Sequence, residues 1–220
     1  MKIITVPQGS PEWHQARAGA ITASMFSTCR QILKSGKNKG DYSAAAKDYA
    51  FRLAVERISG EPLNEGFETY AMRRGHELEP EARLAHEARI EMLIEHAGVV
   101  LTDDGLFGAS ADGLINDDGG SEYKCLIAPE RIRSIVVDQD LSEYHDQVQG
   151  CMWLTGRKWW HFVLYCPALK PAGLDLIIHE QKRDDDYIEA LESDLLAFNG
   201  LVELYRHQIE NASGGITAAA

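Results

Sequence analysis

The chain has 220 residues and a mass of 24.4 kDa, with 45% apolar and 25% charged residues. These values are typical of one sizeable globular domain with a real hydrophobic core. No stretch approaches the roughly 20 apolar residues of a membrane-spanning helix, and no basic-then-apolar signal peptide opens the chain. We therefore expect a cytoplasmic protein without a membrane partner.

The cysteines are scattered without a Cys-x-x-Cys pair, which favours reduced thiols over a zinc site, an iron–sulfur site or disulfides. They are Cys29, Cys125, Cys151 and Cys166.

The net charge of −12 argues superficially against a nucleic-acid partner, but the charge is unevenly distributed. Residues 1–58 carry nine Lys and Arg against four Asp and Glu, whereas the remainder carries 13 against 30. A protein that moves along DNA can confine its positive surface to one channel and keep an acidic exterior. The asymmetry therefore permits nucleic acid as a partner without demonstrating it.

Helices dominate the predictions for the first part of the chain. Ser10 followed by Pro11 is the pattern of an N-cap and a first helical residue, so a short helix should run to Arg17. Apolar residues at helical spacing predict further helices, separated by a flexible basic loop at 34–40 and by the break at Gly60. These helices are expected at residues 22–33, 42–59 and 68–89, and Pro80 is a residue at which the last one can bend.

Strands and crossing helices alternate in the second part. Strands are expected at residues 90–95, 99–102, 106–111, 122–126, 159–166 and 174–180. Helices are expected at residues 129–137, 142–154 and 185–211, the last starting on three aspartates. Residues 212–220 resemble a disordered tail. This order predicts one α/β domain over residues 1–211, with a mixed central β-sheet flanked by helices.

An acid-rich turn in the middle of the chain carries the first chemical signal. Asp112 precedes Glu122 by ten residues, which fits two adjacent strands joined by a polar turn. Because strand side chains alternate, Glu122 and Lys124 should share a face while Tyr123 points the other way. Two carboxylates beside an ammonium suit Mg²⁺-assisted phosphodiester hydrolysis. The alternative is a set of solvated charges on an edge strand.

Three other segments could join this group. Glu79, on a predicted helix, could supply a third carboxylate, although the local sequence alone favours an ordinary solvated helix acid. Gln147 and Gln149 are two residues apart on a helix and face different directions, so at most one is expected in a site. Arg17 and Ser24 lie near helix beginnings and suit a terminal phosphate; a capped helix with a surface arginine is the alternative.

Taken in order, these motifs resemble a known family. They are Trp13-His…Arg17…Ile21-Thr-Ala-Ser24, Gly75-x-x-x-Glu79, Ser110-x-Asp112-Gly, Glu122-x-Lys124-Cys and Gln147-Val-Gln149…Met152-Trp153. The set, which covers about residues 10–165, is similar to the lambda exonuclease branch (phage-type viral recombinase nucleases) of the PD-(D/E)xK superfamily. The resemblance implies a restriction-endonuclease-like core. One departure is Ala111, where the family often has a proline, a change that should remove no ligand.

The resemblance implies a role for each matching residue. Asp112, Glu122 and the Tyr123 backbone carbonyl would bind divalent metal, most simply two Mg²⁺ ions, for which Mn²⁺ could substitute. Glu79 would bind or orient the second metal. The remaining assignments are Lys124 assisting the attacking water, Gln149 positioning the nucleophile, and Arg17 and Ser24 holding the 5′ phosphate. Some family members have a further acid near Asp103 or Asp104, but the spacing is off and neither is assigned.

The family also implies an activity and an assembly. The activity is a Mg²⁺-dependent 5′→3′ exonuclease that degrades one strand of linear double-stranded DNA from a 5′-phosphorylated end to mononucleotides. The 3′ single-stranded product would enter recombination through a single-strand-annealing protein, in the host cytoplasm if the chain is phage- or prophage-encoded. A homotrimeric ring around the DNA is implied, with candidate channel residues Arg30, Lys34, Lys37, Lys39 and Arg52.

Three other interpretations remain open from the sequence. A PD-(D/E)xK endonuclease of repair or restriction type would use the same core, and would cut covalently closed circles. A DNA-binding or assembly protein could keep the fold without turnover, although it would not need Lys124 beside two carboxylates. A metal-independent hydrolase acting on sugars would use two acids but leave Lys124 and Arg17 without a role; insensitivity to chelation would reveal it.

Overall fold

Two four-stranded sheets carry the fold in the computed structural model, which describes residues 1–63 and 69–216. The first sheet has the order β1-β3-β4-β2. Its strands pair antiparallel except for β2, which runs parallel to β4. The strands are short, and their bounds are β1 Lys2–Ile4, β2 Ile21–Thr22, β3 Val99–Leu101 and β4 Phe107–Ser110.

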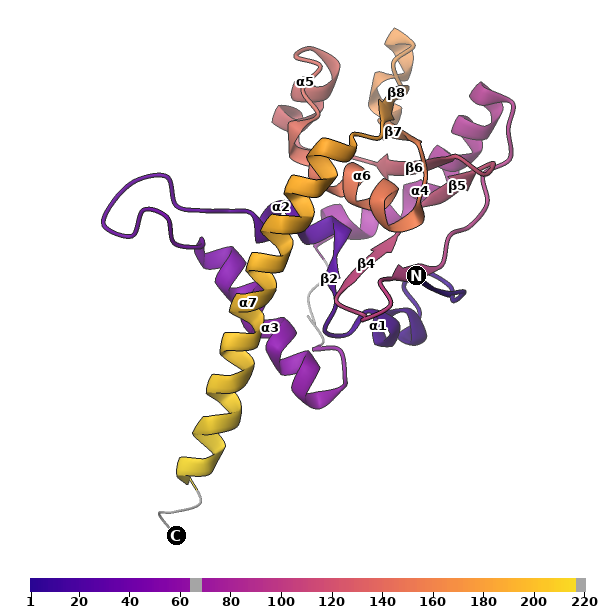
Figure 1. The fold of residues 1–220 in the computed structure, drawn as a ribbon. Coiled ribbons are helices and arrows are strands. Elements are labelled where there is room, and N and C mark those ends of the chain that lie inside the picture. Colours follow the sequence, from indigo (N-terminus) through magenta and orange to yellow (C-terminus); the bar gives the residue numbers. More distant parts are fainter. Residues whose placement is uncertain (64–68, 217–220) are drawn as a thin grey trace.

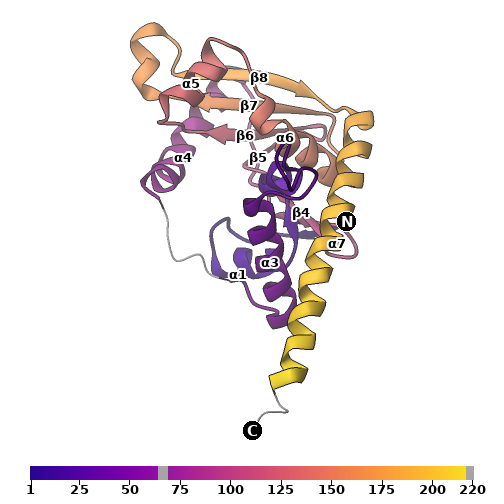
Figure 2. The same ribbon diagram turned by 90° about the vertical axis from the view of Figure 1, so that its left-hand side faces the viewer.

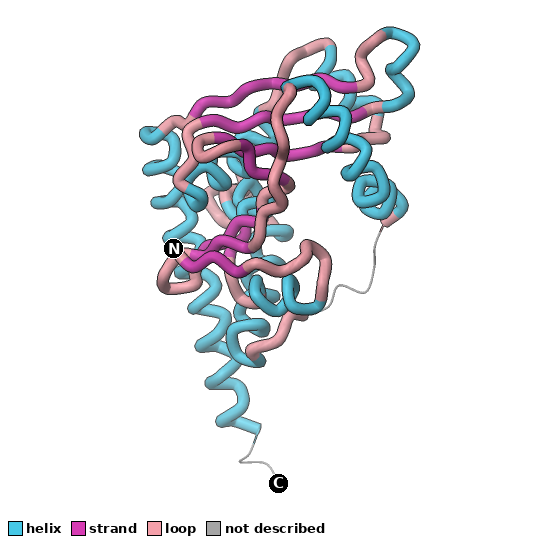
Figure 3. The backbone as a smooth tube through the Cα atoms, turned by 90° about the vertical axis from the view of Figure 1, so that its right-hand side faces the viewer, coloured by secondary structure: helices cyan, strands magenta, loops and turns pink. Residues whose placement is uncertain are grey.

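The second sheet has the order β5-β6-β7-β8 and forms the upper layer in Figures 2 and 3. Its strands are β5 Gly113–Ile115, β6 Gly119–Lys124, β7 Trp159–Tyr165 and β8 Leu176–Lys182. β5 and β6 form an antiparallel hairpin, β6 runs parallel to β7, and β8 returns antiparallel. A parallel neighbour requires a long crossover. Helices α5 (Pro129–Val136) and α6 (Ser142–Thr155) provide it.

Helices cover both faces of this second sheet. Side chains on one face of β6 contact α6, because the Lys124 Nζ donates to the Gln147 Oε1. On the opposite face, the Tyr123 hydroxyl meets His86 of α4 (Tyr70–Ile90), a helix that also contacts β7 and β8. The sheet is therefore enclosed between α4 and α6 (Figure 2).

The long last helix, α7 (Asp185–Ile216), runs beside α3 (Ala44–Ser59) and away from the sheets (Figure 1). Phe198 of α7 stacks on Tyr49 of α3 with ring centroids 6.0 Å apart, and both belong to the main apolar core. The remaining helical segments described are short. They are α1 (Pro11–Arg17), η1 (Ala23–Met25), α2 (Phe26–Cys29) and, between β7 and β8, η2 (Pro167–Ala172).

Most predicted elements are confirmed within a few residues. The α1 cap is as predicted, because the Ser10 Oγ accepts from the Trp13 N–H. The helix predicted at 22–33 ends at Cys29, and the strand predicted at 90–95 is wrong because α4 continues to Ile90. Strands β1, β2 and β5 were not predicted, and the expected single central sheet is instead two mixed sheets.

The closing helix continues to Ile216, beyond its predicted end at Asn211, and residues 217–220 of the predicted tail lie outside the described residues. Glu68, the predicted start of the helix now labelled α4, also lies outside them. All four cysteines are free, as predicted. Within the described part of the chain, the structure contains no helix whose length and apolarity would let it traverse a lipid bilayer.

Candidate active site

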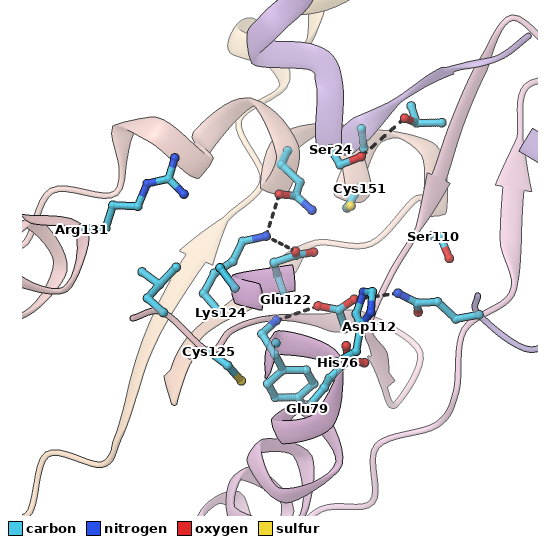
Figure 4. A pocket seen from close by; sticks show the side chains of 18 of the residues that line it. Ser24, His76, Glu79, Ser110, Asp112, Glu122, Lys124, Cys125, Arg131 and Cys151 are labelled. Carbon is cyan, nitrogen blue, oxygen red and sulfur yellow. Dashed lines mark hydrogen bonds and ion pairs between the residues drawn. The ribbon is translucent and has the colours of Figure 1, made fainter. Parts of the chain in front are cut away.

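A cavity of about 500 Å³ collects most of the residues singled out from the sequence. Its walls include residues of α1, η1, α4 and α6, the end of β4 with the bend that follows it, and the end of β6 (Figure 4). The predicted site residues that line it are Arg17, Ser24, Glu79, Asp112, Glu122, Tyr123 and Lys124. Segments separated by more than a hundred residues therefore meet at one place, as expected if the motifs form one site.

The geometry around Asp112 follows from the short length of β5. The register pairs Gly113, the first residue of β5, with Ser121, so the part of β6 beyond Ser121 has no β5 residue beside it. The Asp112 carboxylate fills the next position, because its Oδ2 accepts a hydrogen bond of 2.8 Å from the Tyr123 N–H. The predicted pairing of two adjacent segments is thus confirmed, although Asp112 lies at the bend between β4 and β5 and not within a strand.

Glu122 and Lys124 share the face of β6 that looks into the cavity, as predicted from strand alternation. The Lys124 Nζ lies 2.6 Å from the Glu122 Oε1 and also donates to the Gln147 Oε1 at 3.2 Å. Glu122 is 3% exposed, and its Oε2 is buried without a hydrogen-bond partner among the described residues. A buried carboxylate oxygen without a donor is costly and points to a missing partner.

The electrostatics of the acids reflect this burial. Burial first and the charge of Glu79 second raise the pKa of Asp112 to about 6. Burial and then Asp112 raise the pKa of Glu122 to about 7. Burial opposes the charged form of Lys124, but Glu122 and Asp112 outweigh it and raise its pKa to about 12. The lysine therefore stays protonated, whereas the ionised forms of the two acids are destabilised.

Helix α4 brings the third acid to this group. Glu79 lines the cavity, and burial followed by the charge of Glu122 raises the pKa of its carboxyl group. One turn further along, the Arg83 Nη2 donates to the Asp112 carbonyl oxygen at 2.6 Å. This contact ties α4 to the bend that carries Asp112, so Glu79 and Asp112 are held in a fixed relation.

Arg17 lies in another part of the same cavity. Its guanidinium carbon is 3.8 Å from the centroid of the Trp13 ring, and within the described ranges it makes no hydrogen bond or ion pair. The Trp13 ring is itself fixed, because its Nε1–H donates to the Ser110 Oγ at 2.8 Å. Ser24 is exposed nearby, with its Oγ 3.5 Å from the Thr22 Oγ1. A half-buried cation stacked on an aromatic ring and lacking an acid suits an anionic ligand.

The assignment of Gln149 to the nucleophile is contradicted by its surroundings. Gln149 is buried, its Nε2 donates to the Lys182 carbonyl at 2.8 Å, and its Oε1 accepts from the Asp184 N–H at 3.0 Å. Both ends of the amide therefore fasten the end of β8 to the start of α7. Gln147 lines the cavity instead. The sequence rule that only one of the two faces the site was correct, and the choice between them was wrong.

Several residues that line the cavity were not assigned from the sequence, among them Gln8, Trp13, Ser110 and Gln147. Arg83, which bonds the Asp112 carbonyl oxygen, was not assigned either. Trp13 and Ser110 stood inside quoted motifs, whereas only the folded chain places Gln8 within 3.5 Å of the Asp112 Oδ1. Asp103 and Asp104 are exposed and do not line the cavity. Asp103 pairs with the N-terminal amine instead, and Asp104 accepts a hydrogen bond from the Leu106 N–H.

The channel candidates fall into two groups. Arg30 is engaged by Asp146 at 2.6 Å and Asp194 at 2.8 Å, and Arg52 pairs with Glu56 at 2.9 Å. These two arginines therefore serve the internal packing of the helices. The three lysines of the basic loop are exposed: Lys34, Lys37 and Lys39.

Replacing Asp112 by Asn should stabilise the protein when divalent cations are chelated. The folded-state pKa of Asp112 is raised, so its contribution to stability is full below about pH 4 and is lost as the pH rises through about 6. Asn keeps the acceptor for the Tyr123 N–H without the buried charge. At pH 8 in EDTA we expect the free energy of unfolding, measured by urea denaturation, to rise by about 1–3 kcal/mol, and this gain should disappear near pH 4. The exposed control Asp117→Asn should change little, and a pH-independent or negative effect of Asp112→Asn would contradict this account.

The two glutamines should separate activity from stability. Gln149→Ala leaves a carbonyl and an N–H without partners, so unfolding should become easier by about 1–3 kcal/mol. Gln147→Ala removes polar contacts with Lys124 and Glu122 at the cavity, so it should lower the turnover rate with little change in stability. Urea denaturation and the initial rate per folded molecule measure the two effects. The assignment is wrong if Gln149→Ala lowers the rate of the folded enzyme more than Gln147→Ala does.

Comparisons with known proteins agree with this site. Residues 12–158 match the YqaJ-like viral recombinase domain family. The alkaline exonuclease LHK-Exo of Laribacter hongkongensis is 30% identical over 94% of this chain and 100% of its own, with a TM-score of 0.78, or 0.80 for its complex with dAMP. A phage-related exonuclease of Haemophilus somnus 129PT shares the fold at 15% identity, over 88% of this chain and 96% of its own, with a TM-score of 0.63. No curated protein sequence matches the chain.

These findings confirm the predicted family resemblance and the α/β fold class, and together they support a DNA exonuclease. The match to the family covers well over half of the chain, including every cavity residue from Trp13 to Gln147. The chain therefore belongs to the YqaJ-like viral recombinase domain family.

Proposed function

We propose that the protein is a Mg²⁺-dependent 5′→3′ exonuclease that degrades one strand of linear double-stranded DNA to mononucleotides. One observation carries the proposal: a single cavity holds an acid–lysine group and, apart from it, the guanidinium of Arg17, which has no acidic partner among the described residues. An enzyme that removes a terminal nucleotide must recognise the end and the scissile phosphate together. The cavity offers one group suited to each task.

A divalent metal fits the residues at β6. In the described ranges no three His, Cys, Asp or Glu side chains form a ready-made metal cluster. The donor set is nonetheless that of a hard cation: the buried Glu122 Oε2 has no hydrogen-bond donor in the described part of the chain, and Asp112 supplies a second carboxylate. The N–H of Tyr123 points to the open edge of β6, and a strand residue directs its carbonyl to the same side. We propose that Asp112, Glu122, the Tyr123 carbonyl and Glu79 hold two Mg²⁺ ions, with Mn²⁺ able to substitute. When bound, such ions acidify water and neutralise charge on the phosphate.

Lys124 and Gln147 then act on the reacting groups. Lys124 is protonated and fixed between Glu122 and Gln147, so its Nζ can orient the attacking water and stabilise the negative charge that develops on the phosphate. Gln147 holds that ammonium from α6. The chain thus supplies positioning and electrostatic stabilisation, which are the main requirements for phosphodiester hydrolysis.

Arg17 and Ser24 are proposed to hold the 5′ phosphate of the strand being cut. The guanidinium is fixed on the Trp13 ring, and a phosphate would give it hydrogen bonds that residues 1–63 and 69–216 do not provide. Ser24 adds a hydroxyl at the start of a short helical segment. Holding the terminal phosphate sets the distance to the next phosphodiester, so cleavage would release one nucleotide at a time and proceed 5′→3′.

The remaining proposals concern assembly and context. Three exposed lysines lie close together in the chain, on the loop 34–40. They agree with a DNA-facing surface on an otherwise acidic protein. We propose a homotrimeric ring around the duplex, acting in recombination, with a single-strand-annealing protein receiving the 3′ single strand.

A linear duplex with a phosphate at only one 5′ end tests the activity, its polarity and its metal requirement together. We expect mononucleotides from the phosphorylated strand in Mg²⁺ and none in EDTA. Lys124→Ala should lower the rate by at least a hundredfold while the fold survives. Covalently closed circular DNA should remain intact. Cutting of circles would establish an endonuclease, and binding without any cleavage would establish a DNA-binding protein.

Arg17→Ala should abolish the preference for phosphorylated ends. Loss of a charged hydrogen-bond donor costs on the order of tenfold or more, and only the phosphorylated substrate should suffer. The measurement is the ratio of rates on 5′-phosphorylated and 5′-hydroxyl duplexes. Arg131→Ala is the matched control, because Arg131 lines the same cavity but pairs with Glu143 at 2.6 Å. An unchanged ratio in Arg17→Ala counts against the phosphate pocket.

A further inference from the structure

A chain of hydrogen bonds runs beneath the site, on the face of β6 away from the cavity. The Ser121 Oγ donates to the Tyr123 Oη at 3.3 Å, and the Tyr123 Oη lies 3.0 Å from the His86 Nδ1. The His86 Nε2 in turn lies 2.9 Å from the His161 Nδ1. His86 and Ser121 are both fully buried. These hydrogen bonds join β6, α4 and β7, and the family resemblance assigns them no role.

The protons in this chain can be placed from its geometry. Because Tyr123 accepts from Ser121, its own hydroxyl proton is free to go to the His86 Nδ1. A neutral imidazole that accepts at one nitrogen carries its proton on the other, so the His86 Nε2–H donates to His161. Every polar atom of the His86 ring is therefore satisfied, which makes this a specific arrangement and not a chance contact.

Tyr123 connects this chain directly to the candidate site. Its backbone N–H holds the Asp112 carboxylate at 2.8 Å, and its neighbours in sequence are Glu122 and Lys124. The side chain of the same residue is anchored to α4 through His86. A shift of Tyr123 along or across the strand would therefore move Asp112 and Glu122 together.

His86 stands on the same stripe of α4 as the third acid. Glu79, Ala82 and His86 are spaced by three and four residues, so they share one face of the helix. Ala82 is fully buried against the cluster that contains Tyr123 and Val163, which lets the helix approach the sheet closely. The His86–Tyr123 hydrogen bond thus fixes the helix against β6 two turns away from Glu79.

We propose that His86 and Tyr123 form a positioning pair that sets the separation between Glu79 and the Asp112–Glu122 pair, and through it the affinity for divalent metal. The inference rests on the proposed function, since it takes these three acids as the metal-binding group. Groups that orient metal ligands typically change metal affinity or activity by roughly 10–100-fold when they are lost. Arg83 contributes a second tie between α4 and Asp112, so the effect should lie near the lower end of that range.

Tyr123→Phe tests this pair, because it removes the hydroxyl and keeps the ring. The matched control is Tyr165→Phe, since the Tyr165 Oη on β7 also bonds α4, at the Glu81 Oε2, but on the exposed surface. Mn²⁺ binding without DNA is measured by isothermal titration calorimetry, alongside the Mg²⁺ concentration that gives the half-maximal rate. We expect Tyr123→Phe to weaken Mn²⁺ binding by about tenfold and to raise the Mg²⁺ requirement similarly. The KM for DNA at saturating Mg²⁺ and the preference for phosphorylated ends should not change.

Wild-type Mn²⁺ affinity in Tyr123→Phe, with or without a lower unfolding temperature, would reduce the pair to a structural role and overturn the proposal. So would an equal loss in Tyr165→Phe. If Tyr123→Phe does not fold, His86→Asn and His86→Leu replace it, because only Asn offers an acceptor to the Tyr123 hydroxyl. Asn should then bind Mn²⁺ more tightly than Leu, and equal affinities overturn the proposal. A wild-type protein that neither binds Mn²⁺ nor cuts DNA would instead overturn the proposed function itself.

Discussion

The hydrogen bond from the Tyr123 N–H to the Asp112 carboxylate joins the two segments on which the candidate site depends. It exists because β5 begins only at Gly113, opposite Ser121, and leaves the following part of the β6 edge open. A longer β5 would have paired that edge with backbone and kept side chains out. The open edge instead receives one acid from the bend and presents a second acid and a lysine from the strand. Burial at this edge then decides the chemistry of all three groups.

The electrostatic environment at this edge disfavours the ionised forms of both acids. Burial raises the pKa of Asp112 and of Glu122, and neighbouring acids raise them further, so their ionised forms are destabilised. Lys124 compensates only in part, since it bonds one oxygen of Glu122 and leaves the other without a donor. A bound divalent cation would relieve this strain and hold both acids ionised. Under the proposed function, stability without metal and activity with metal would therefore oppose each other, which is common where a site needs charge.

The sequence predicted the site better than the strands around it. The ten-residue spacing from Asp112 to Glu122 implied a hairpin, and period-two alternation placed Glu122 and Lys124 on one face; both inferences hold. Strands β2 and β5 were missed because each is very short and has neither an alternating pattern nor a long run of β-branched residues. The choice between Gln147 and Gln149 required the rotation of α6 relative to β6, which is set by packing. The positive charge of Arg30 is likewise visible in the sequence, but its acidic partners are not.

The central claim is that the open edge of β6 binds divalent metal, and anomalous diffraction from crystals grown with Mn²⁺ tests it most directly. The account predicts a strong anomalous peak within coordination distance of the Asp112 and Glu122 carboxylates and the Tyr123 carbonyl oxygen. The carboxylate oxygen of Glu122 that lacks a hydrogen-bond donor should be among the ligands. Crystals that contain Mn²⁺ elsewhere but show no peak at this edge would contradict the account.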